Sequence, residues 1–176
     1  MNYVRDAAMT ALIFGFFASA WFGWAQERPP ITWKKWLGIA GGASLVLAGA
    51  GGFLAWQHWS DGSALGEPGA MRRYGIILGI EVAVAALGAV VLTVRDHREL
   101  IAPWVCFVVG AHFVPLAGPL ESPILYPLAV AMVLVAAGTV PYARRHGLAP
   151  SAVTGVGAGV SLFVCAAVSL VIALTL

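Results

Sequence analysis

Residues 74–94 read YGIILGIEVAVAALGAVVLTV and contain one charged side chain, that of Glu81. A helix needs about 20 predominantly apolar residues to cross the hydrocarbon core of a bilayer. Strands of a membrane barrel are about 10 residues long and alternate in polarity, whereas this run is twice as long and does not alternate. Backbone polar groups in lipid must be satisfied within the segment, so we predict that residues 74–94 form a transmembrane helix.

Five more stretches of similar length and composition lie on either side of this one. The chain is 60% hydrophobic and only 10% charged, whereas a soluble domain carries about 25% charged residues to cover its wet surface. We therefore predict an all-α integral membrane protein, a six-transmembrane-helix bundle that forms a single domain over residues 1–176 with no extramembrane domain. The predicted spans are about 7–26, 36–57, 74–94, 100–118, 122–142 and 151–175.

The basic residues divide unequally between the two sets of connections. Seven lie in or next to the first, third and fifth loops: Arg28, Lys34, Lys35, Arg95, Arg98, Arg144 and Arg145. Three lie on the other side: Arg5, Arg72 and Arg73. Cytoplasmic loops carry the excess of Lys and Arg, so we expect these three loops to be cytoplasmic and both termini to lie outside.

The composition also bears on location and partners. Arg outnumbers Lys, and Ala, Gly and Val dominate, which is typical of a GC-rich bacterial genome and favours the plasma (inner) membrane of a bacterium. The first run ends in QERPP at residues 26–30 without a small-residue cleavage site, so we expect it to remain as the first span. A net charge of +2 without a basic tract predicts no nucleic-acid partner. All seven tryptophans lie near predicted span ends, where we expect them to anchor the helices at the membrane interface.

Small residues recur at four-residue spacing in three spans and predict close helix packing. In the second span they are Ala40, Ser44, Ala48 and Gly52; in the sixth, Gly157, Ser161, Cys165 and Ser169; and in the third, Gly75, Gly79 and Ala83. Packing within one chain is the simpler interpretation. The alternative is a homo-oligomer formed through the Gly, Ala and Ser faces of the second and sixth spans.

Two ionisable residues fall inside predicted spans, Glu81 in the third and His112 in the fourth. Such residues are costly in lipid and are functional-site candidates. Each lies six or seven residues from the same membrane surface, which corresponds to a depth of roughly 10 Å at 1.5 Å per residue. The loop between the two helices, residues 95–99, is short, so the helices should be antiparallel neighbours. We predict that Glu81 and His112 are in contact and can share one proton.

Residues 112–127 read HFVPLAGPLESPILYP, with proline at every fourth position from Pro115. Proline removes a hydrogen bond to the carbonyl four residues back, so we expect Pro115 to bend the fourth span next to His112. Ser122 is a candidate N-cap for the fifth helix, with Pro123 at its first position. Tyr126 lies at a depth similar to that of the Glu81–His112 pair, and the three side chains define a predicted outward-facing polar pocket.

Four weaker candidates could reach the same layer from the other spans: Ser169, Thr10, Gln57 and His58. A zinc site needs three or four Cys, His or carboxylate ligands, and the deep residues supply two. The sequence therefore predicts no metal and no cofactor. Cys106 and Cys165 lie in apolar runs without a CxxC context and are expected to be unpaired core residues.

Three functions fit these features. The first is a proton-linked or pH-sensitive transporter or channel for a small solute or ion, which the Glu81–His112 pair favours. The second is a non-catalytic assembly or regulatory subunit of the membrane. The third is an intramembrane enzyme that acts on a lipid or isoprenoid with Glu81 and His112 as acid and base.

Overall fold

The computed structural model describes residues 3–176, and within them it contains six α-helices and no strand. The helices are α1 (Val4–Ala25), α2 (Lys34–Gln57), α3 (Ala70–Val94), α4 (Ile101–Leu116), α5 (Leu125–His146) and α6 (Pro150–Thr175). Single 3-10 turns precede α2, α3 and α4: η1 (Ile31–Trp33), η2 (Ala64–Gly66) and η3 (Arg98–Leu100). Counted with the turns that continue into α2 and α4, all six segments are long and apolar enough to cross a membrane, which confirms the six predicted spans.

Several helix ends differ from the predicted ones, and local backbone geometry accounts for two of them. Gly69 adopts a left-handed conformation (φ 80°), which lets α3 begin at Ala70 rather than at residue 74. Gly147 (φ 65°) ends α5, which continues to His146 instead of stopping at residue 142. Glycine adopts positive φ without the steric cost that a side chain adds, so it suits both positions.

The predicted N-cap at Ser122 is wrong. The helix α5 begins at Leu125, three residues later than expected, and Ile124 precedes it without a side-chain cap. The backbone carbonyl of Ser122, and not its hydroxyl, accepts a hydrogen bond from the Leu125 N–H (3.1 Å). The hydroxyl itself is buried and has no hydrogen-bond partner among the described residues.

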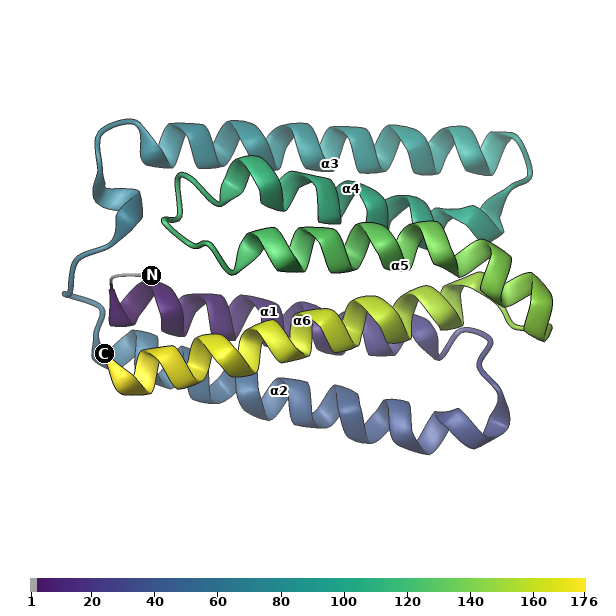
Figure 1. The fold of residues 1–176 in the computed structure, drawn as a ribbon, viewed down its shortest axis with the longest axis horizontal. Coiled ribbons are helices and arrows are strands. Elements are labelled where there is room, and N and C mark those ends of the chain that lie inside the picture. The colour runs from purple at the N-terminus through teal and green to yellow at the C-terminus, as the bar shows by residue number, and fades with distance from the viewer. Residues whose placement is uncertain (1–2) are drawn as a thin grey trace.

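The helices form an elongated bundle with α2 at one edge and α3 at the other (Figure 1). Between them, α1 packs against α2 and α6. The helix α5 packs between α6 and α4, and α4 packs against α3. The α2–α3 connection therefore has to cross the whole bundle, at the end where both termini lie, which explains its length (Figure 1). We call this the terminus end.

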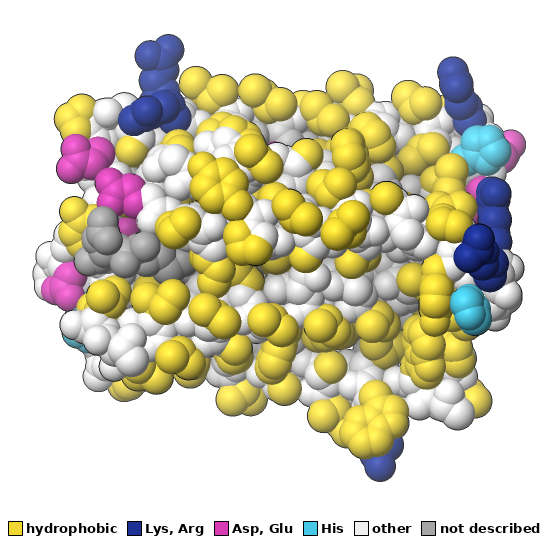
Figure 2. Space-filling view, viewed as in Figure 1, with side chains coloured by type: hydrophobic (Ala, Val, Ile, Leu, Met, Phe, Trp, Pro, Cys, Tyr) yellow, Lys and Arg dark blue, Asp and Glu magenta, His cyan; other side chains and the backbone are white. Residues whose placement is uncertain are grey.

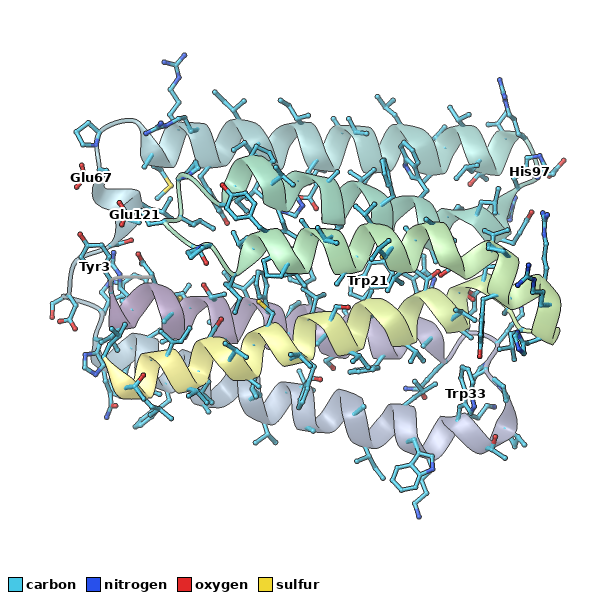
Figure 3. The ribbon with its side chains drawn as sticks, in the orientation of Figure 1. Tyr3, Trp21, Trp33, Glu67, His97 and Glu121 are labelled. Atoms are coloured by element: carbon cyan, nitrogen blue, oxygen red, sulfur yellow. The ribbon has the colours of Figure 1, made fainter. Side chains whose placement is uncertain are left out.

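Contacts with α1 hold the α2–α3 connection against the terminus end. The Asp6 carboxylate accepts a hydrogen bond from the Ala64 N–H (2.7 Å), and the Arg5 guanidinium donates to the Trp59 carbonyl (2.8 Å). On the face that Figure 2 shows, hydrophobic side chains cover much of the surface between the two ends of the bundle. Figure 3 places Glu67 at the terminus end and His97 at the opposite end.

Close backbone approach dominates the middle of the bundle. A Cβ at Gly15 would lie 2.8 Å from the Ser44 carbonyl oxygen, and one at Gly155 would lie 2.6 Å from the Trp21 carbonyl oxygen. The small-residue face around Ser44 and Ala48 thus packs against α1 of the same chain. Self-association of the chain stays a prediction.

Two tryptophans have a role other than the predicted one. Trp36, Trp56 and Trp59 are more than half exposed, as expected of interface anchors. Trp21, by contrast, is 6% exposed and belongs to the largest cluster of buried hydrophobic side chains, which we call the main core and which includes Phe14, Phe113 and Met132. Figure 3 shows Trp21 within the bundle. Trp104 lies over Gly88 of α3, and its indole nitrogen is buried without a hydrogen-bond partner among the described residues. Both residues lie close enough to helix ends to be mistaken for anchors, because sequence position alone does not show which way an indole points.

Candidate functional site

The helix α3 is the least buried of the six, with Ala70 its one buried residue. Half-buried positions follow a helical spacing along one face of α3, among them Tyr74, Leu78, Glu81, Ala85 and Gly88. Residues three and four apart share a helix face, so this stripe is the face that packs against α4. Glu81 lies in the middle of it.

His112 lies in the penultimate turn of α4, and its ring is fixed by its own helix. The Nδ1 atom makes a hydrogen bond with the carbonyl oxygen of Val109, one turn earlier. The ring also lies 4.3 Å from that of Phe113, centroid to centroid, and Phe113 is itself buried in the main core. These contacts leave the Nε2 atom of His112 facing α3.

The predicted contact between Glu81 and His112 is confirmed. The Oε2 atom of Glu81 lies 3.5 Å from the Nε2 atom of His112, and the two side chains are 15% and 10% exposed. The contact agrees with the predicted similar depth of the two residues, but their distances from the helix ends differ from the predicted ones. Glu81 is eleven residues into α3, whereas His112 is four residues before the end of α4. The helix α3 extends beyond α4 at the terminus end, and this offset brings the two side chains together (Figure 1).

The hydrogen bond to Val109 determines how the pair holds protons. A carbonyl oxygen only accepts, so the Nδ1 atom of His112 carries hydrogen and the neutral ring presents Nε2 as an acceptor. A neutral His112 then needs a protonated Glu81 opposite it, and an ionised Glu81 needs a doubly protonated His112. Both arrangements contain the same number of protons and have no net charge. In either arrangement one proton would lie between Oε2 and Nε2, so proton sharing by the pair stays a prediction.

The weaker candidates are engaged elsewhere or lie apart from the pair. The Thr10 hydroxyl donates to the Asp6 carbonyl of its own helix (2.7 Å), and His58 binds the Asp61 carboxylate (2.8 Å). Ser169 is fully buried, and its hydroxyl has no hydrogen-bond partner among residues 3–176. Gln57 is exposed at the last position of α2.

Tyr126 is half exposed on α5. None of the described hydrogen bonds connects Tyr126 with Glu81 or His112. Its role in a polar pocket stays a prediction.

Pro115 lies in the last turn of α4, one residue before the helix ends, rather than within a longer span. It lines a groove between the terminus ends of α3 and α4, which we call the Arg73 groove. The six lining residues are Arg73, Ile76, Ile77, Pro115, Gly118 and Pro119. Ile77 precedes Glu81 by one helical turn and Pro115 follows His112 by one turn, so the groove lies directly beyond the pair, toward the terminus end.

Two features of the site were not predicted from the sequence. The carbonyl of Val109 sets the tautomer of His112, and only the i, i−3 spacing in a helix would have indicated it. The contact between Trp104 and Gly88 is a second fixed point of the α3–α4 interface, and a large ring opposite a glycine is the pattern that would have found it. Within the part of the chain that the structure describes, no group of three or more His, Cys, Asp and Glu side chains is arranged to hold a metal ion.

Comparisons with protein families, curated proteins and solved structures find no match to this chain. Its function therefore has to be argued from the site itself.

Proposed function

We propose that the chain is a small proton-linked or pH-sensitive membrane transporter or channel, and that the Glu81–His112 pair is its proton site. The observation that carries this proposal is the 3.5 Å contact between Oε2 of Glu81 and Nε2 of His112, combined with the hydrogen bond that fixes Nδ1 on Val109. The substrate is a small solute or an ion.

The charge of the pair supplies a mechanism of exchange. Loss of the shared proton leaves a carboxylate facing an imidazole lone pair, with a net charge of −1 among apolar helices. An uncompensated charge in a membrane interior is strongly unfavourable. The pair consequently releases its proton when a cationic ion or solute takes the place of the proton and restores neutrality, and it recovers the proton when that cation leaves. This reciprocity is what coupling between a proton and a solute requires.

Proton flux into vesicles tests the proposal before any substrate is known. The purified protein is reconstituted with a pH-sensitive dye inside, a potassium diffusion potential drives protons inward, and ions and small solutes are then added in turn. Glu81→Gln and His112→Gln should each lower the flux about tenfold or more, equivalent to about 1.4 kcal/mol of lost stabilisation along the path.

Matched controls carry the same substitutions at exposed sites. Glu67→Gln and His97→Gln change the same chemistry in loops at opposite ends of the bundle and should leave the flux within about twofold of wild type. Wild-type vesicles that conduct no faster than protein-free vesicles, with every ion and solute added, would rule out the proposal.

We also propose an orientation with both termini outside and the α1–α2, α3–α4 and α5–α6 connections in the cytoplasm of a bacterium. These three connections and the helix ends next to them carry seven Lys and Arg residues at one end of the bundle, against three at the terminus end. The two natural cysteines are buried, so neither should react with a membrane-impermeant maleimide. On intact cells, Gly66→Cys should be labelled and Arg145→Cys should not, and the reverse pattern would invert the orientation.

A further inference from the structure

The Arg73 groove combines an apolar floor with one cationic side chain. It is an open groove of about 320 Å³, and apart from Arg73 its lining consists of isoleucine, proline and glycine. A second groove of about 450 Å³ lies at the α1–α2 face and is lined by Met9, Leu12, Gly52, Ala55, Trp56 and Trp59. The second groove is larger but has no charged lining residue. Of the two grooves, the Arg73 groove is therefore the one that offers a cation to an anionic lipid head group.

The guanidinium of Arg73 is available to an anion. Arg73 is exposed in the first turn of α3, and no ion pair connects it with an acidic side chain among the described residues. Two of the acidic residues at the terminus end are already engaged, Asp6 with the Ala64 N–H and Asp61 with His58. A guanidinium matches a phosphate with two parallel hydrogen bonds, and the start of a helix adds favourable potential for an anion.

We propose that the Arg73 groove binds one anionic phospholipid, with its phosphate on Arg73 and the first part of one acyl chain along Ile76, Ile77 and Pro115. The position of the cation favours a lipid over a free phosphate ion. Arg73 stands at the end of a membrane-spanning helix, where head groups lie, and the groove continues from it along apolar residues toward the bilayer centre. A soluble anion would have no partner for that apolar surface, whereas an acyl chain covers it.

The bound chain would approach the proton site. Ile77 lies four residues before Glu81, and Pro115 lies three residues after His112, which corresponds to a rise of about 5–6 Å along each helix. The lipid thus covers the pair from the terminus end. The binding itself requires no proton transfer, so it can be tested apart from the proposed transport function.

Lipid retention measured by native mass spectrometry tests the assignment. The detergent-purified protein is titrated with phosphatidylglycerol or with phosphatidylcholine of the same chains. Wild type should retain phosphatidylglycerol in preference, and Arg73→Gln should lower its affinity about tenfold. Arg72→Gln removes the same charge from the neighbouring position, which does not line the groove, and should change the affinity less than about twofold.

A second variant blocks the chain and keeps the charge. A Cβ at Gly118 meets no atom within 4 Å, so Gly118→Leu should fold normally and fill the groove, again lowering retention about tenfold. Gly42→Leu, also in open space on α2, is its matched control and should retain the lipid as wild type does. Equal losses for Arg72→Gln and Arg73→Gln, equal retention of the two lipids, displacement by inorganic phosphate alone, or unchanged retention in Gly118→Leu would each overturn the proposal.

Discussion

The α1–α6 and α3–α4 interfaces are built in opposite ways. Along α1, the side chains at Ala7, Ala8, Ala11 and Ala18 are completely buried, and Gly155 of α6 faces the α1 backbone. Along α3, Ala70 alone is buried, and most of the helix surface is isoleucine, leucine and valine directed away from the bundle. The only ion-pair contact between two transmembrane helices among residues 3–176 lies in the looser interface.

The two interfaces of this small bundle therefore differ in role: the α1–α6 interface stabilises the fold, and the α3–α4 interface contains the Glu81–His112 pair. Helices in lipid gain little from apolar burial and associate mainly through close packing, which small residues allow. The middle of the bundle therefore supplies the rigid scaffold. The edge helix α3 packs mainly against α4, so under the proposed function a partner that replaces the shared proton would reach Glu81 without disrupting the scaffold.

The largest effect should come from a side chain placed in the tight interface. Gly155→Leu introduces a Cβ that would lie 2.6 Å from the Trp21 carbonyl oxygen and 2.7 Å from the Ala25 Cβ. Neither atom can move without shifting α1, so we expect a loss of about 3 kcal/mol or more in the free energy of unfolding. Unfolding by SDS in mixed micelles measures it.

The matched substitution in the loose helix is Gly79→Leu. A Cβ at Gly79 meets nothing within 4 Å, so the free energy of unfolding should change by less than about 0.5 kcal/mol. If Gly79→Leu were as damaging as Gly155→Leu, α3 would have a packing partner on its outer face and the contrast between the two interfaces would be lost.

An intermediate effect is expected where α3 and α4 do approach closely. A Cβ at Gly88 would overlap the Nε1 atom of Trp104, so Gly88→Leu forces the indole to turn or the helices to separate. A ring yields more readily than a backbone, and we expect a cost of about 1–3 kcal/mol in the free energy of unfolding. Trp104→Ala in the same background should recover part of that loss, and an additive double variant would show that the ring is not what Gly88 accommodates.

The sequence predicted the scaffold well for physical reasons. Six apolar runs of this length form transmembrane helices in lipid, because a helix satisfies all its backbone hydrogen bonds internally. Two such helices joined by a short loop are antiparallel neighbours. The contact of Glu81 with His112 followed from that reasoning, although the two residues lie at unequal distances from their helix ends. The predicted spans end where charged residues occur in the sequence, but a helix can continue past such residues. The helix α3 begins at Ala70, directly after Gly69, and not after Arg73.

What the sequence did not predict depends on which way side chains and interfaces face. Trp21 and Trp104 lie near helix ends, yet they point into the bundle or onto a neighbouring helix. The position of α3 at an edge could not be read from its residues, because a lipid-facing surface and a buried surface are equally apolar in a membrane. The Arg73 groove likewise depends on the offset between two helices.

A double-mutant cycle on the polar pair measures how strongly it joins α3 to α4. Glu81→Leu leaves Nε2 of His112 without a partner, and His112→Phe leaves the Glu81 carboxyl without one. Each should lower the free energy of unfolding by about 1 kcal/mol. The variant with both substitutions has no unpaired polar group at this contact and should be nearly as stable as wild type, although its proton flux is lost. Additive losses would show that the two residues do not interact.

The smallest effect should come from a buried polar contact in the middle of the bundle, between α5 and α6. The Thr154 hydroxyl lies 3.2 Å from that of Thr139, but it also lies 2.8 Å from the Pro150 carbonyl, and Thr139 donates to the Val135 carbonyl at 2.8 Å. Each hydroxyl has one hydrogen and a nearby carbonyl of its own helix to receive it. Thr139→Val therefore leaves Thr154 satisfied and should cost about 0.6 kcal/mol or less in the same SDS unfolding measurement. A cost above that of Glu81→Leu would place the important polar contact in the scaffold rather than at its edge.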